Sequence, residues 1–271
     1  MRAFVFAFLI FVSWPGLATT ESDELTELVQ RYIAFYEQGK YAEAISSAEL
    51  ALNYAKKARG PDHPAVAMIL GSLAALYEAQ GRYEETESLH KRALAILEKA
   101  LGADHPHVAL GLSSLAALYT HQGRYEEAGS LHKRAVAILE KALGPDHVDV
   151  ALGINNLAVL YTDQGRYEEA ESLHKRALAI REKALGPEHP DVALGFTNLA
   201  AVYRKQGRYE EAESLHKSAL VIFKKVLGSE HPDFALGLNN LALLLGDQGR
   251  YEEAESLHKR ALAIREKALG P

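Results

Sequence analysis

One segment of 23 residues occurs twice without a single difference, as GRYEEAESLHKRALAIREKALGP at residues 165–187 and 249–271. Looser copies begin at Gly39, Gly81, Gly123 and Gly207, and successive copies are always 42 residues apart. A fixed period of this length, without insertion or deletion, is typical of proteins that stack one small unit many times. We therefore expect an array of about six equivalent units, each packed against its neighbours.

Each unit has the sequence pattern of two helices. Apolar residues recur at three- and four-residue steps within residues 167–185 and form one stripe on a long helix, with Ala170, Leu173, Ala177, Ile180 and Ala184. Gly186 is expected to end this helix by a left-handed stop, and Pro187 prevents its continuation. Pro190 can begin a second, shorter helix that runs to Gln206. We expect the two helices to fold back on each other across turns of one or two residues.

The segment 198–220, NLAAVYRKQGRYEEAESLHKSAL, resembles a tetratricopeptide repeat, with matching positions at Ala200, Tyr203, Gly207, Tyr209, Ala212 and Ala219. The whole unit, with its LGPEHPDVA linker and its TNLA or LNNLA start, is similar to the 42-residue repeats of kinesin light chains. The resemblance covers residues 39–271, with unit starts near 39, 81, 123, 165, 207 and 249. It implies an all-α fold, a right-handed α-solenoid of about six antiparallel helix pairs. It also implies a concave groove that is lined by the first helix of each pair and holds peptides.

Both ends of the array depart from the pattern. Residues 19–38 are expected to contain a degenerate first helix, capped by Ser22, in which Tyr32 replaces the small residue of later units (Ala74, Ala116, Ala158, Ala200 and Ala242). We interpret the first pair as the terminal cap that such arrays need. At the other end, Leu262 and Leu269 would face an absent neighbour. We expect a fragment or a truncated gene, the alternative being a protein that ends at this point.

Residues 1–18 have the pattern of a cleaved secretory signal. Arg2 precedes an apolar run over residues 3–14, and the small residues Gly16 and Ala18 follow. The alternative is an uncleaved membrane anchor, but 12 apolar residues form only about 18 Å of helix against about 30 Å of hydrocarbon. We therefore expect an exported protein, periplasmic or secreted. The chain has no cysteine, so no disulfide contributes to its stability.

Charge and motifs argue against several classes of function. The formal net charge is −6, and the basic residues are spread along the long helices without forming a block. Nucleic acids and anionic membrane surfaces both require a basic patch, so neither is an expected partner, and we expect no membrane insertion once the signal is removed. The sequence contains no glycine-rich phosphate loop and no HExxH motif. We expect neither an enzyme nor a bound cofactor.

Ten of the twelve histidines recur with the 42-residue period. One set lies in the long helices (His90, His132, His174, His216 and His258), and the other lies in the linkers (His63, His105, His147, His189 and His231). Successive units are separated by about 10 Å, whereas zinc needs three or four ligands at about 2 Å. The sets therefore predict no metal site. We interpret the helix histidines as packing residues and the linker histidines as caps of the following helix.

The short helices differ most between units, and their polar residues are the candidate binding residues. These are Ser114, Asn155, Asn156, Thr197, Asn198, Arg204, Lys205, Asn239 and Asn240. Asparagine is a mediocre helix former, but its amide can both donate to and accept from a peptide backbone. The family resemblance implies that these residues face the groove. The alternative is that they are solvated positions that have drifted.

Kinesin light chains hold acidic, aromatic peptides in such a groove. In this chain the candidate face carries only Arg204 and Lys205 as basic residues, between Asp163 and Asp247, so a preference for acidic ligands is not expected. We predict a scaffold that binds a peptide segment or a protein partner. The alternatives are a structural spacer of a larger protein, or the regulatory part of an enzyme whose catalytic domain lies outside this chain.

The signal leads to the first prediction. The mature protein is expected to begin near Thr19, because the short apolar run ends in residues that a signal peptidase accepts. The intact mass of protein purified from its native host measures the cleavage directly. A mass that includes Met1 would show that the segment is retained.

Overall fold

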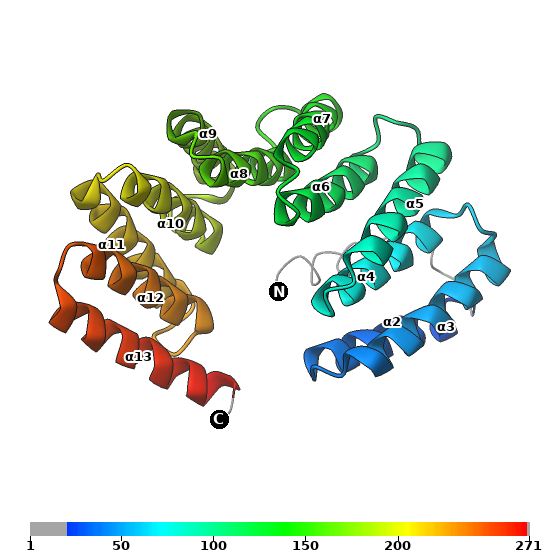
Figure 1. The fold of residues 1–271 in the computed structure, drawn as a ribbon, viewed down its shortest axis with the longest axis horizontal. Coiled ribbons are helices and arrows are strands. Elements are labelled where there is room, and N and C mark those ends of the chain that lie inside the picture. Colours follow the sequence, from blue (N-terminus) through cyan, green and yellow to red (C-terminus); the bar gives the residue numbers. More distant parts are fainter. Residues whose placement is uncertain (1–20, 270–271) are drawn as a thin grey trace. The chain divides into compact units, whose positions relative to one another are not determined.

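The computed structural model describes residues 21–269 of the chain. The predicted signal at residues 1–18 lies outside the described residues, as do residues 270–271. The chain divides into two compact units, Met1–Ala142 and Leu143–Pro271. All regular structure within residues 21–269 is helical, and the predicted all-α fold is confirmed (Figure 1).

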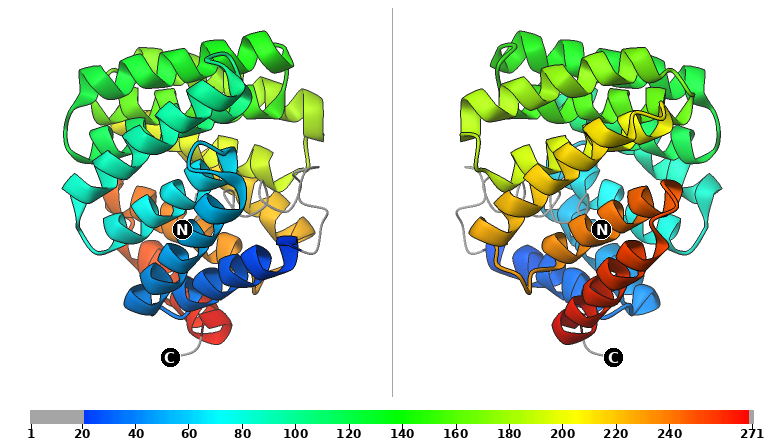
Figure 2. Two further views of the ribbon diagram at one scale, coloured as in Figure 1. Left: turned by 90° about the vertical axis from the view of Figure 1, so that its right-hand side faces the viewer. Right: turned by 90° about the vertical axis from the view of Figure 1, so that its left-hand side faces the viewer.

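Short and long helices alternate in both units, and consecutive helices pack against each other (Figure 2). The first unit contains α2 (Glu21–Glu37), α3 (Tyr41–Arg59), α4 (Pro64–Ala79), α5 (Tyr83–Leu101), α6 (Pro106–His121) and α7 (Tyr125–Leu143). The second contains α8 (Val148–Asp163), α9 (Tyr167–Leu185), α10 (Pro190–Lys205), α11 (Tyr209–Val226), α12 (Pro232–Asp247) and α13 (Tyr251–Leu269). Within residues 21–269 the predicted twelve helices in six pairs are therefore confirmed, and each unit is an α-solenoid of three pairs.

Several local predictions are wrong. The connections are longer than expected, with residues 206–208 after a short helix and residues 186–189 after a long one. Gly186 has φ 86° and ψ 155°, an extended conformation that is almost exclusive to glycine and carries the chain away from the helix end. Ser22 lies inside α2 and does not precede it, because the helix already includes Glu21. Ala184 is exposed, since the buried side of α9 turns away from it in the last turn.

The linker histidines are confirmed as helix caps. Each lies in an extended conformation directly before a short helix, and its Nδ1 accepts a hydrogen bond from the backbone amide two residues later, at 3.1–3.2 Å (His63, His105, His147, His189 and His231). This bond satisfies one of the amides that the first turn of a helix leaves without a partner. Proline follows in four of the five copies, where its missing N–H costs nothing.

The helix histidines are confirmed as packing residues in four of the five repeats that carry one. His90, His132, His174 and His216 are between 3% and 6% exposed, whereas His258 in the last helix is half-buried. Burial lowers the pKa of His132, His174 and His216 to about 4 in each case. These three side chains are therefore neutral in the folded protein at neutral pH.

Two short helices of the second unit, α10 and α12, pack closely against the long helix before them. A Cβ atom on Gly195 would lie 2.9 Å from Leu178 Cδ1, and one on Gly237 would lie 2.9 Å from Leu220 Cδ2. The absence of a side chain at these two positions lets the helices approach. Around this contact Phe223 and other apolar residues of successive pairs form one continuous core.

Arg181 is buried at a position where other long helices carry large apolar residues (Leu97, Leu139 and Phe223). Its side chain is only 9% exposed, and its Nη1 donates a long hydrogen bond of 3.4 Å to the main-chain oxygen of Asp191. Burial lowers the pKa of the guanidinium, because the charge is held away from water.

The buried histidines predict acid sensitivity. An unfolded histidine takes up its proton near pH 6.5, while the folded His132, His174 and His216 do so only near pH 4. The unfolded state binds more protons between these values, so stability falls as the pH drops from about 6.5 to about 4, by up to about 1.4 kcal/mol per histidine and pH unit. Urea unfolding at a series of pH values measures this slope.

Replacing the three buried histidines by leucine should reduce the pH dependence of the free energy of unfolding above pH 5, where carboxylates contribute least. The control is His121→Gln at an exposed position, which should leave that pH dependence unchanged. An unchanged slope in the triple variant would show that other groups cause the acid sensitivity.

Arg181→Leu is expected to raise stability. Replacing a buried charge by a well-packed apolar residue often adds about 1–4 kcal/mol, and Leu97 and Leu139 occupy the same position in other units. Thermal unfolding followed by circular dichroism measures the change. Arg265→Leu is the matched control, because α13 has the same sequence as α9 but Arg265 is only half-buried. A loss of stability specific to Arg181→Leu would mean that the bond to Asp191 outweighs the cost of burial.

Candidate functional site

One side of each short helix in the second unit is exposed and has a repeated chemical pattern. Residues at steps of four, three and four lie on the same side of a helix. In α8, α10 and α12 these four positions carry an aliphatic residue, an asparagine, a second aliphatic residue and a charged residue. They are Leu152, Asn156, Val159 and Asp163 in α8, Leu194, Asn198, Ala201 and Lys205 in α10, and Leu236, Asn240, Leu243 and Asp247 in α12. We call these twelve residues the asparagine face. Val159, Leu236 and Leu243 are each 40–42% exposed, and the three asparagines are half-buried.

A second polar row lies beside this face, and its side chains are bonded within the protein. Asn198 Nδ2 donates to Asn155 Oδ1 at 2.8 Å, which joins α10 to α8. Thr197 Oγ1 donates to the main-chain oxygen of Ala193 at 3.1 Å. Asn239 Oδ1 lies 2.9 Å from Nδ1 of His258 on α13. The predicted asparagines therefore divide between this bonded row and the half-buried positions of the asparagine face, with Asn198 taking part in both.

The remaining predicted residues have different surroundings. Arg204 Nε donates to Asp247 Oδ2 at 2.5 Å and links α10 to α12, so its charge is paired. Lys205 is exposed. Ser114 lies on α6 in the first unit, and its Oγ donates to the main-chain oxygen of Leu110 at 3.1 Å. Eight of the nine predicted residues thus lie in the second unit, and the positive charges of Arg204 and Lys205 are balanced on the same short helices by Asp163 and Asp247.

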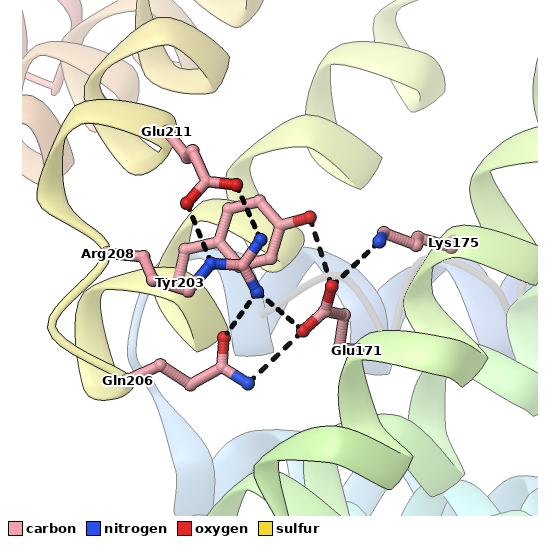
Figure 3. A network of polar contacts seen from close by, with 6 residues as sticks. All are labelled: Glu171, Lys175, Tyr203, Gln206, Arg208 and Glu211. Carbon is pink, nitrogen blue, oxygen red and sulfur yellow. Dashed lines mark hydrogen bonds and ion pairs between the residues drawn. The ribbon is translucent and has the colours of Figure 1, made fainter.

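A polar network that sequence reasoning missed joins α9 to the turn between α10 and α11 (Figure 3). Glu171 accepts hydrogen bonds from the Tyr203 hydroxyl at 3.3 Å, from Gln206 Nε2 at 3.2 Å and from Arg208 Nη1 at 2.8 Å. The Arg208 guanidinium also lies 3.8 Å from the centre of the Tyr203 ring and donates to Glu211. Such stacked and bidentate contacts require arginine and exclude lysine.

Electrostatics favour the ionised form of Glu171. Partial burial alone would raise the pKa of this carboxyl, but hydrogen bonds from Lys175 and Gln206 and the charge of Arg208 outweigh that effect and lower the pKa. The same carboxylate–arginine contact recurs between Glu87 and Arg124 at 2.8 Å and between Glu213 and Arg250 at 2.7 Å. The glutamate and the arginine are 37 residues apart in all three pairs, and this constant separation could have predicted the contact from the sequence.

Two long helices lack the carboxylate of this network. The period places Ile45 in α3 and Gly129 in α7 where α5, α9 and α11 carry Glu87, Glu171 and Glu213. Arg166, which has the place of Arg208, donates to Glu169 and to Gln164. The array is therefore regular in backbone but not in its polar contacts.

Residues 21–269 contain no cluster of three or more histidine, aspartate or glutamate side chains that is arranged to hold a metal ion. In the same range, no helix combines the length and the apolar character that crossing a bilayer requires.

The sequence pattern of the tetratricopeptide repeat matches the chain in five overlapping stretches, 28–99, 66–119, 107–183, 150–196 and 191–267. The chain belongs to the tetratricopeptide repeat family. None of the curated protein sequences matches it.

Solved structures extend the comparison of this tetratricopeptide repeat protein. A kinesin light chain of Podosopora anserina with nearly identical TPR-like repeats is 31% identical, with a TM-score of 0.62, over 77% of this chain and 99% of that one. This match confirms the resemblance to kinesin light chain repeats. BtubC (BKLC) from P. vanneervenii is 24% identical, with a TM-score of 0.66, over 90% of this chain and 93% of that one.

A more distant structure shares the fold alone. A Rap protein in complex with competence and sporulation factor is 20% identical to the tetratricopeptide repeat chain, with a TM-score of 0.58. The match covers 88% of this chain and 73% of that one.

Proposed function

We propose that this tetratricopeptide repeat protein binds an extended peptide segment of a partner protein on the asparagine face and has no catalytic activity. The observation that supports the proposal is the pattern of exposed aliphatic side chains beside half-buried asparagines, on three consecutive short helices. The tetratricopeptide repeat fold generally mediates protein–protein interaction, and a Rap protein with the same fold has been solved with its factor bound.

The spacing of the face suits an extended chain. Neighbouring helices pack about 10 Å apart, and an extended peptide rises about 3.3 Å per residue. Asn156, Asn198 and Asn240 would therefore each meet about every third peptide group. Their amides can donate and accept at once, which matches a peptide backbone of any sequence.

The flanking residues indicate which ligand side chains are preferred. Val159 and Leu243 are both about two-fifths exposed, so apolar ligand side chains would find apolar contacts between the asparagines. Because Arg204 is paired with Asp247, the face offers little attraction to an acidic peptide. A purely structural spacer would not need exposed aliphatic residues on three successive helices, and this favours binding over the spacer alternative.

The expected secretory signal supports a binding partner outside the cytosol. We propose that the partner is an exported or cell-surface protein, in a periplasmic or secreted setting. The complete absence of cysteine suits an oxidising compartment, since no thiol can mispair there.

The proposal is tested by changing Asn156, Asn198 and Asn240 together to alanine. Alanine is the better helix former, so the helices should be retained. Each lost hydrogen bond is worth about 0.5–1.5 kcal/mol, so affinity should fall by roughly a hundredfold in total. Isothermal titration measures it, with a ligand recovered by affinity capture or from a displayed library of random peptides.

The matched control changes three exposed serines of the long helices to alanine at the same 42-residue period: Ser172, Ser214 and Ser256. This variant should bind like the wild type. Equal affinity of the asparagine variant and the serine variant would exclude the asparagine face as the contact surface.

A further inference from the structure

The exposed sides of the long helices share a charge pattern. Helices α5, α7, α9 and α13 each carry arginine, alanine and glutamate at successive steps of three residues, and the four alanines are exposed (Ala95, Ala137, Ala179 and Ala263). Arg134 of α7 donates through Nη2 to Glu98 Oε1 of α5 at 2.7 Å, so the arginine of one long helix pairs with the glutamate of the long helix before it. Because the alanine is exposed in α5 as it is in α13, the exposure of this side does not depend on how many repeats follow.

Helix α11 departs from this pattern at all three positions. Ser218 replaces the arginine, Val221 replaces the alanine, and Lys224 replaces the glutamate. Val221 is 66% exposed, so little burial offsets its lower helix propensity relative to alanine. Departures that weaken local structure without a gain in packing are typical of functional positions.

The departures in α11 also place two positive charges side by side. Since equivalent pairs are related by multiples of 42 residues, the contact of Glu98 with Arg134 has a counterpart in Lys224 and Arg260. Two cations thus occupy positions that an ion pair occupies elsewhere. Within residues 21–269 Lys224 has no ion-pair partner, and Arg260 lies with its Cζ 5.2 Å from the centre of the Phe234 ring.

Helix α3 in the first unit shows that cations at these two positions are close enough to interact. It also departs from the pattern, with Leu50, Asn53 and Lys56, and the next long helix carries Arg92. Burial and, to a smaller extent, the charge of Arg92 lower the pKa of Lys56. Lys56 is half-buried whereas Lys224 is exposed, so the lysine of α11 is the better placed of the two to contact a ligand.

We propose that the exposed side of α11 docks an acidic amphipathic helix of a partner protein. The docking surface consists of Ser218, Val221, Lys224 and Arg260, which we call the α11 patch. An aliphatic side chain of the partner would cover Val221, and a carboxylate would lie between Lys224 and Arg260. A helix presents two such side chains at a step of three or four residues, the same step that separates Val221 from Lys224. No residue of the α11 patch belongs to the asparagine face, so the two surfaces are separate.

Charge selects this partner over others. A basic segment would bring further positive charge to Lys224 and Arg260. Nucleic acids and anionic membranes extend over larger areas and would also meet Glu182 of α9 and Glu266 of α13, which flank the patch. A short acidic helix needs to place only one carboxylate, at the two cations.

The test uses the full chain and a displayed library of 18-residue helical peptides, with leucine on one side and a random choice of glutamate, serine and alanine on the other. Lys224→Glu and Val221→Ala each return α11 to the pattern of α5, α7, α9 and α13, so both variants should fold. We expect the enriched peptides to carry glutamate beside leucine. Their affinity, measured by fluorescence anisotropy, should fall at least tenfold on Lys224→Glu, or about 1.4 kcal/mol, and by less on Val221→Ala.

The matched control is Lys57→Glu, which makes the same charge change at another exposed lysine of a long helix and should leave the affinity unchanged. The triple asparagine variant should also bind these peptides like the wild type, and a loss there would overturn a separate surface. No enrichment, or enrichment that Lys224→Glu does not reduce, would overturn the proposal. Sedimentation equilibrium tests a second copy as the occupant: a wild-type dimer that Lys224→Glu converts to a monomer would overturn docking of a different protein.

Discussion

The contact between each long helix and the short helix of the next repeat is the interaction on which the rest of the second unit depends. Where Gly195 lies against Leu178, the two helices approach so closely that a single added carbon would overlap. That approach buries His174 and Arg181, and it brings the turn at Arg208 within reach of Glu171. The short helices are thereby held side by side, and this is what aligns Asn156, Asn198 and Asn240.

Features that recur in nearly every repeat could be predicted from the sequence, because a signal repeated five or six times stands out from local variation. The helix pairs, the histidine caps and the packing histidines belong to this class. Contacts between neighbouring repeats were harder to predict from the sequence. The bond between Asn198 and Asn155 joins residues 43 apart, so no comparison of equivalent positions reveals it. Burial of Arg181 is a second example, because its charge also suits the end of a helix in the sequence and only the packing of α10 over it shows that it is covered.

The polar residues of the second unit fall into two groups. Glu171, Tyr203 and Arg208 hold neighbouring repeats together through stacked and paired contacts. The asparagine face combines half-buried amides with aliphatic side chains, and binding is the role that we propose for it. In that proposal, variation at Asn156 or Val159 would alter recognition while the contacts of Glu171 and Arg208 keep the repeats in place.

The strict 42-residue register also has a consequence for how such a protein changes over generations. Every side chain of the array has its partners in its own or an adjoining copy, so adding or removing 42 residues returns each one to an equivalent partner. Any other number would turn the apolar stripes away from each other. Stretches as alike as 165–187 and 249–271 are natural points for recombination between copies. The gene can therefore lengthen or shorten its product by whole repeats while every intermediate still folds.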